Sequence, residues 1–215
     1  MSRSRSFGIA AIFAASTSVG FAQSWNQPWY VTSAEGWGPG VVESRVDDCF
    51  PTKLRKMAVV DDFRATGRPV KRVVWWGTVL SREQLQYPFL IAFYKEVPES
   101  CKPNLEKVIY QCVPARASLA GYDCNKRRIW KFVADLPFWF VGAEGEKHWI
   151  QISEIDTRSW RVGYSDFRWA FHLRSPNYSS WNTCAALGFD PALNLFNITD
   201  PCTKEARDMA FQLFP

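Results

Sequence analysis

Histidine is the scarcest reactive residue of this 215-residue chain, which contains only His148 and His172. Two histidines cannot complete a zinc site alone, and the sequence has no His-Glu-x-x-His motif. It also lacks a Cys-x-x-Cys pair, a Gly-x-Ser-x-Gly elbow and a glycine-rich phosphate loop. These absences argue against zinc hydrolases, disulfide oxidoreductases, serine esterases and nucleotide-dependent enzymes.

Long hydrophobic runs are scarce as well, and the clearest one lies at the N-terminus. Arg3 and Arg5 precede an apolar run from Phe7 to Ala15, and small residues continue to Ala22. This order predicts a secretory signal peptide over residues 1–22, with an uncleaved N-terminal anchor as the alternative. No later segment reaches eighteen apolar residues, so we expect no membrane span after signal removal. The expected location is secreted, periplasmic or extracellular.

The chain carries only a small excess of positive over negative charge. The net charge is +5, and removal of Arg3 and Arg5 with the signal lowers it to +3. Such a balance gives no reason to expect a nucleic-acid partner. The hydrophobic fraction of 47% is instead enough for a sizeable core, and eleven tryptophans need an explanation.

Six cysteines follow the signal, and an even number in an exported chain indicates three disulfide bonds. We expect Cys184 to pair with Cys202 just before the last strand. Two of Cys101, Cys112 and Cys124 are then expected to pair with each other, and the third with Cys49.

Short segments rich in β-branched and aromatic residues follow one another after residue 56, separated by turn signals. The expected strands are 57–63, 70–77, 89–94, 107–113, 129–135, 148–153, 168–172 and 209–214. This pattern predicts an all-β, jelly-roll-like antiparallel β-sandwich with little helix, beyond a brief helical turn within 184–197. We expect one domain over 23–215 with an irregular N-terminal arm at 23–45.

Six pieces of the chain, in order, resemble a family of bacterial exported β-sandwich modules of uncharacterised role, often found in proteins with Pro-Glu-Pro sorting tails. The pieces are Asp61-Asp62-Phe63, Gly67-Arg68-Pro69, Trp75-Trp76-Gly77, Phe89-Leu90-Ile91-Ala92-Phe93-Tyr94, Trp149-Ile150-Gln151-Ile152 and Asp208-Met209-Ala210-Phe211. Val60 and the large number of cysteines depart from the family pattern. The resemblance implies a sandwich fold and export, and it implies no reaction.

Glu154 and Asp156 are the enzymatic candidates, because alternate residues of a strand point into the same cleft. A Glu-x-Asp pair resembles the core of laminarinase-like glycoside hydrolases. Ser159 stands where that motif has its third carboxylate, so the general acid is missing. The competing interpretation is a polar strand end beside Arg158.

Asp61 and Asp62 are adjacent, so a strand sends them to opposite faces. We expect the inward carboxylate to be satisfied by arginine or backbone N–H groups, with a structural calcium as the less favoured alternative. No other cofactor is expected.

Aromatic side chains outside the strands are candidates for stacking on sugars or for contact with a protein partner. The ligand-binding candidates are Trp29, Trp37, Tyr178 and Trp181. The sequence therefore predicts an exported, non-enzymatic structural or binding module whose partner is a polysaccharide or another envelope protein. The alternatives are a lectin-like module using these aromatics and a glycoside hydrolase using Glu154 and Asp156.

Overall fold

The fold is known from a computed structural model. It describes residues 25–27, 29, 37–38, 41–43, 45–46, 58–79, 81–155, 167–170, 184, 187–189, 195–198 and 208–215.

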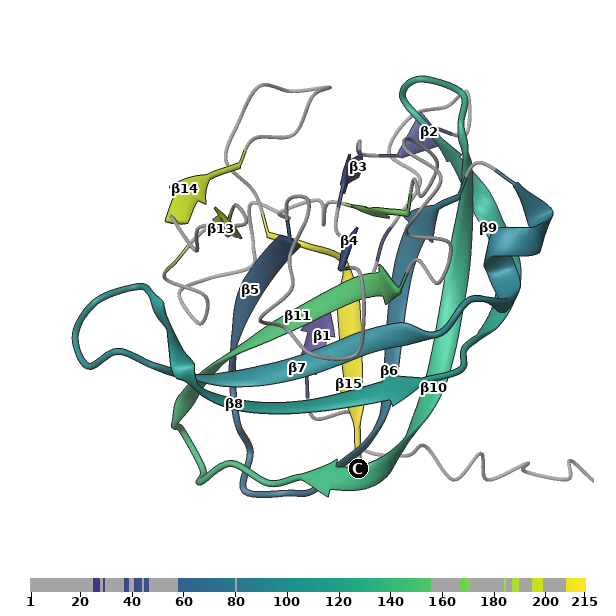
Figure 1. Ribbon diagram of the computed structural model, residues 1–215. Helices are drawn as coiled ribbons and strands as arrows, with labels where there is room; N and C mark the ends of the chain where they lie inside the picture. The colour runs from purple at the N-terminus through teal and green to yellow at the C-terminus, as the bar shows by residue number, and fades with distance from the viewer. Residues whose placement is uncertain are drawn as a thin grey trace, which may run out of the picture.

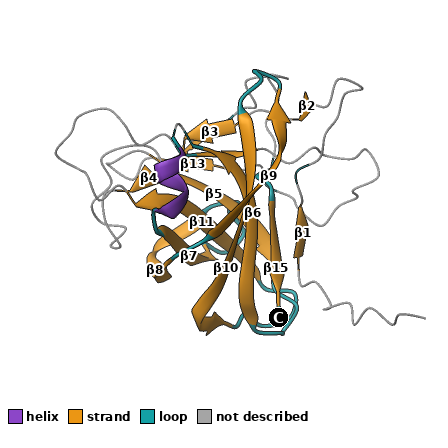
Figure 2. Ribbon diagram, turned by 90° about the vertical axis from the view of Figure 1, so that its right-hand side faces the viewer, coloured by secondary structure: helices purple, strands orange, loops and turns teal. Residues whose placement is uncertain are grey.

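Two mainly antiparallel sheets form a sandwich, which confirms the predicted all-β class (Figure 1). The eight-stranded sheet contains β1 (Trp25–Gln27), β15 (Phe211–Phe214), β6 (Val70–Thr78), β10 (Arg128–Phe140), β9 (Arg116–Asp123) and β2 (Trp37–Gly38), with β12 (Arg168–Ala170) and β3 (Val41–Glu43) beside this path. The seven-stranded sheet contains β14 (Leu195–Asn197), β13 (Leu187–Phe189), β5 (Ala58–Arg64), β11 (Lys147–Ile155), β7 (Phe89–Glu96), β8 (Pro103–Val113) and β4 (Arg45–Val46). The one helical element of the described residues is the 3₁₀ turn η1 (Arg82–Gln86), purple in Figure 2.

Alternate residues of the central strands fill the space between the sheets. Trp75 stacks on Phe132 with ring centroids 5.6 Å apart and meets Phe89 edge-on at 4.9 Å. On β11, Ile150 and Ile152 point into this core, while Trp149 lies on the opposite face, as the alternation predicted. These aromatic rings pack with valine, isoleucine and leucine side chains in one inter-sheet core.

The outer faces of both sheets also carry buried apolar residues. Trp76 lies outside the eight-stranded sheet and is only 6% exposed, in a cluster with Trp29 and Val74. Trp149 belongs to the corresponding cluster outside the seven-stranded sheet. The adjacent tryptophans Trp75 and Trp76 therefore belong to two separate apolar clusters. Most of the described tryptophan side chains are buried or half-buried.

Several local predictions need correction. Strand β9 was not expected, and the arm predicted to be irregular contributes the short strands β1 to β4. Within 184–197 the described residues form β13 and β14 rather than a helical turn. The turn predicted between β5 and β6 is present, with Gly67 at φ +73°, a conformation that glycine adopts without strain.

Candidate functional site

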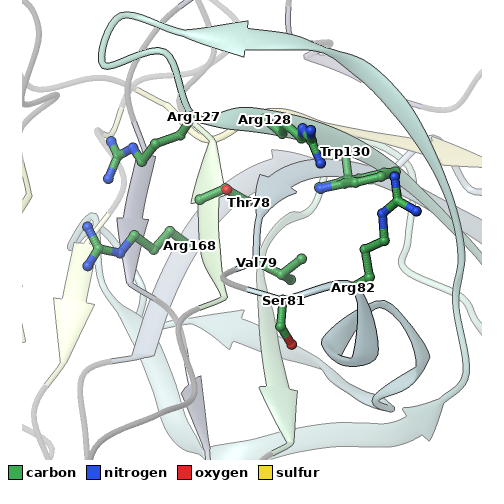
Figure 3. A pocket seen from close by; sticks show the side chains of 8 residues that line it. All are labelled: Thr78, Val79, Ser81, Arg82, Arg127, Arg128, Trp130 and Arg168. Atoms are coloured by element: carbon green, nitrogen blue, oxygen red, sulfur yellow. The ribbon is translucent and has the colours of Figure 1, made fainter.

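A cavity of about 360 Å³ opens where η1 meets the ends of β6, β10 and β12 (Figure 3). We call it the arginine cavity; its lining residues are Thr78, Val79, Ser81, Arg82, Arg127, Arg128, Trp130 and Arg168. Arg82, Arg128 and the ring of Trp130 lie together on one side, and Arg127 and Arg168 lie on the other. The volume falls in the range of small-molecule sites.

The β9–β10 turn positions part of the cavity wall through Asp123, a fully buried carboxylate. Its Oδ1 accepts the backbone N–H groups of Asn125 at 2.9 Å and Arg127 at 2.8 Å. Its Oδ2 accepts Nε of Arg127 at 2.7 Å. Asp123 thus fixes the turn from which β10 starts, and it neutralises Arg127 locally.

Gly77 allows β12 to bring Arg168 to the cavity. A Cβ atom on Gly77 would lie 2.5 Å from the carbonyl oxygen of Arg168 and 2.5 Å from the ring of Phe167. Only glycine fits this close approach, which explains the glycine that follows the two tryptophans.

The remaining cavity arginines have no carboxylate partner in the part of the chain that the structure describes. Within the described residues, no ion pair or hydrogen bond is recorded for the side chains of Arg82, Arg128 and Arg168, whereas other exposed arginines such as Arg72 and Arg116 share Asp135. The half-buried ring of Trp130 packs against the inter-sheet core and is rigidly held. Two unneutralised guanidinium groups beside the indole, with a third on the other side of the cavity, favour a planar or ring-shaped anion.

Asp61 points inward and satisfies the expectation of structural hydrogen bonding. Its Oδ2 accepts the N–H of Met209 at 2.7 Å, and its Oδ1 accepts the N–H of Asp62 at 3.0 Å. Burial, and then the nearby carboxylate of Asp208, raise the pKa of Asp61 well above its ordinary value. The two adjacent carboxyl groups face opposite sides of the sheet, so they do not form one ligand set.

Asp62 lies outside the seven-stranded sheet with Glu96 and Lys147, a group that we call the acid–lysine cluster. Nζ of Lys147 is 3.1 Å from Glu96 Oε1 and 4.0 Å from Asp62 Oδ2. Neither carboxyl oxygen of Asp62 accepts a hydrogen bond. Burial, partly opposed by Lys147, raises the pKa of Asp62 to about 7.

Only one of the two glycosidase candidates lies among the described residues. Glu154 is fully buried, and Asp156 lies outside the described residues. Of the two histidines, His148 packs between Phe63 and Phe140, and burial lowers its pKa despite the nearby carboxylate of Glu146. His172 is outside the described residues.

Of the four aromatic ligand candidates, only Trp29 has a described side chain. Trp29 is only 5% exposed and packs in the outer cluster, so it does not offer a stacking surface. Trp37 contributes its backbone to β2, while Tyr178 and Trp181 lie outside the described residues. The exposed tryptophan that the sequence analysis missed is Trp139, 61% exposed, with Nζ of Lys71 4.4 Å from its ring centroid.

The predicted disulfide pairing is wrong for Cys184, which is bonded to Cys101 rather than to Cys202. Cys184 lies before β13 and Cys101 lies between β7 and β8, 83 residues apart in the chain. They meet at the acid–lysine cluster, where Nζ of Lys147 is 3.2 Å from Sγ of Cys184. The expectation that Cys101 pairs with Cys112, Cys124 or Cys49 is therefore also wrong. Cys112 and Cys124 are disulfide-bonded as well, and Cys49 and Cys202 lie outside the described residues.

The arginine cavity was not predicted from the sequence. Its arginines come from η1, β10 and β12, and only Arg127 and Arg128 are close in sequence.

The family profile described as "Domain of unknown function (DUF7901)" matches residues 23–214, and the chain belongs to this family. No curated protein and no solved structure matches the chain significantly. Among the described residues, no helix combines the length and apolarity needed to cross a membrane.

Proposed function

We propose that this member of the DUF7901 family is an exported, non-enzymatic binding module that holds acidic saccharides in the arginine cavity. The observation that carries the proposal is a set of three cavity arginines with no carboxylate partner among the described residues. Arg82 and Arg128 lie beside the half-buried ring of Trp130, and Arg168 lies on the other side of the cavity. Guanidinium groups bind a carboxylate through paired hydrogen bonds, and an indole face packs on the apolar face of a sugar ring.

Two further features support export and the absence of catalysis. The disulfide between Cys101 and Cys184 suits an oxidising compartment, in agreement with the signal-like N-terminus and with the resemblance to exported modules. The cavity lining contains neither a carboxylate nor a histidine. Glycoside hydrolysis normally needs two carboxyl groups at the sugar, so binding is the activity that this lining supports.

The test is titration calorimetry with galacturonic acid oligosaccharides and with the same oligosaccharides after methyl esterification. Esterification keeps the ring and removes the charge, so only the acid form is expected to bind. Arg82→Gln and Arg128→Ala are each expected to weaken binding about tenfold, the loss of roughly one charge-assisted hydrogen bond.

Arg116→Ala is the matched control, because Arg116 is 75% exposed in its side chain and lies outside the cavity. Equal binding of acid and ester, or an equal effect of the control substitution, would contradict the proposal. If the protein binds inorganic phosphate while its affinity for the acid and the ester saccharide is the same, the cavity is a phosphate site and not a saccharide site.

A further inference from the structure

The acid–lysine cluster contains an anomaly that the fold alone does not explain. Asp62 is fully buried, yet neither of its carboxyl oxygens accepts a hydrogen bond. An ionised carboxylate in such a place costs several kcal/mol unless a close partner compensates it. Its nearest cation, Nζ of Lys147, stands 4.0 Å away.

The strand register places the side chains of Asp62, Lys147 and Glu96 next to one another. Trp149 on β11 is opposite Asp62 on β5, and Lys147 is two residues earlier on the same face of β11. Glu96 ends β7 on the other side of Lys147. The amine therefore lies between two carboxyl groups, and its side chain is only 11% exposed.

The protonation states suit a condensation. Burial raises the pKa of Asp62 to about 7, which favours the protonated carboxyl more than in an exposed aspartate. A protonated carboxyl is the electrophilic form toward an amine. The carboxylate of Glu96, 3.1 Å from Nζ of Lys147, is placed to accept a proton from the ammonium group.

We propose that Lys147 and Asp62 are joined by an intramolecular amide bond, with Glu96 as the proton carrier. The neutral amine of Lys147 attacks Cγ of protonated Asp62, the N–C bond forms, and one C–O bond breaks. Glu96 makes the amine neutral by taking one proton from the ammonium group, and it passes that proton to the departing hydroxyl, which leaves as water. A second proton leaves the nitrogen for solvent as the amide forms, and Glu96 is restored as a carboxylate. No oxidant or other reactant is consumed.

The product removes the anomaly. An amide near the buried tryptophan Trp149 replaces the ammonium group of Lys147 and the carboxyl group of Asp62, so Asp62 no longer has to be ionised without a hydrogen bond. A cavity of about 340 Å³ lined by Glu96 and Lys147 among others gives the released water a route to solvent. The bond also ties β5 to β11 close to the Cys101–Cys184 disulfide, whose Cys184 Sγ lies 3.2 Å from Lys147 Nζ.

The test is mass spectrometry of the reduced, alkylated and denatured chain. The intact mass is expected to fall below the sequence mass by one water. Trypsin should not cleave after Lys147, so a branched peptide joining residues 57–64 to residues 132–158 is expected. Linear peptides that end at Lys147, with or without loss of water from Asp62, would overturn the proposal.

Three variants separate the bond from folding. Lys147→Arg keeps the positive charge, and Asp62→Ala removes the electrophile; both should show the full sequence mass. Glu96→Gln should form the bond at least tenfold more slowly, and an unchanged rate would overturn the role of Glu96. Retention of the Cys101–Cys184 disulfide by each variant shows that it has folded, and wild-type peptide maps decide the question independently.

Discussion

The arginine cavity and the outer face of the seven-stranded sheet both contain polar and charged side chains, but they differ in how these are partnered. Arg82 and Arg128 are exposed and have no carboxylate partner among the described residues. On the sheet face, the hydroxyl of Tyr94 donates to Gln151 at 2.5 Å, and Gln151 donates to Ser153 at 2.9 Å, all buried. Polar groups that are buried and paired stabilise the fold, whereas exposed, unpaired cations are free for a ligand.

The largest expected effect concerns the buried, hydrogen-bonded polar groups on the outer face of the seven-stranded sheet. Gln151→Ala removes the acceptor of the Tyr94 hydroxyl and leaves a cavity, so we expect a loss of about 3 kcal/mol in the free energy of unfolding. Denaturant unfolding measures it, with the exposed Gln86→Ala as the control. Saccharide affinity should not change, and a combined loss of stability and affinity would show that the two regions are not separate.

The second effect concerns the proton on Asp61. The pKa of Asp61 is raised in the folded protein above the ordinary 3.8, so the folded state binds this proton more tightly than the unfolded state does. The protonated carboxyl therefore adds to the free energy of unfolding at low pH, and this addition is lost as the pH rises above about 4. Asp61→Asn should cost about 2 kcal/mol at pH 5, through a weakened bond to Met209, and should flatten the pH dependence.

Urea unfolding at several pH values between 4 and about 8 checks this expectation. Asp135→Asn serves as the control, because that side chain is 58% exposed. An equally steep decline of stability with pH in Asp61→Asn would assign the titration to another group.

A smaller effect is expected on the ligand side. Arg168→Ala should weaken acidic saccharide binding about threefold, because this guanidinium contributes to the field of the cavity but turns away from Trp130 (Figure 3). The free energy of unfolding should stay within about 0.5 kcal/mol of the wild type. The threefold difference should shrink at high salt, and a salt-independent difference would argue for a direct contact instead.

The smallest effect belongs to an exposed ion pair outside both regions. Arg72 contacts Asp135 at 2.6 Å, but the two side chains are 46% and 58% exposed. Arg72→Ala should therefore change the free energy of unfolding by at most about 0.5 kcal/mol. A larger loss in thermal or denaturant unfolding would show that exposure is a poor guide to the importance of pairing in this protein.

The strands were predictable because their residues follow a local rule. Alternation placed Trp149 opposite Ile150 and separated Asp61 from Asp62, and the structure has both arrangements. The burial of Trp29 was not predictable, because a tryptophan between strands has no local signal that distinguishes packing from exposure.

The sequence by itself determined the all-β class, the main strands and their inward and outward faces, since a period of two and β-branched residues act over a few neighbours. Only the tertiary structure decided that Cys101 meets Cys184, that Lys147 meets Asp62 and Glu96, and that arginines from η1, β10 and β12 share a cavity. Strand register and the packing of loops against the sheets bring these residues together, and both depend on contacts between segments far apart in the chain.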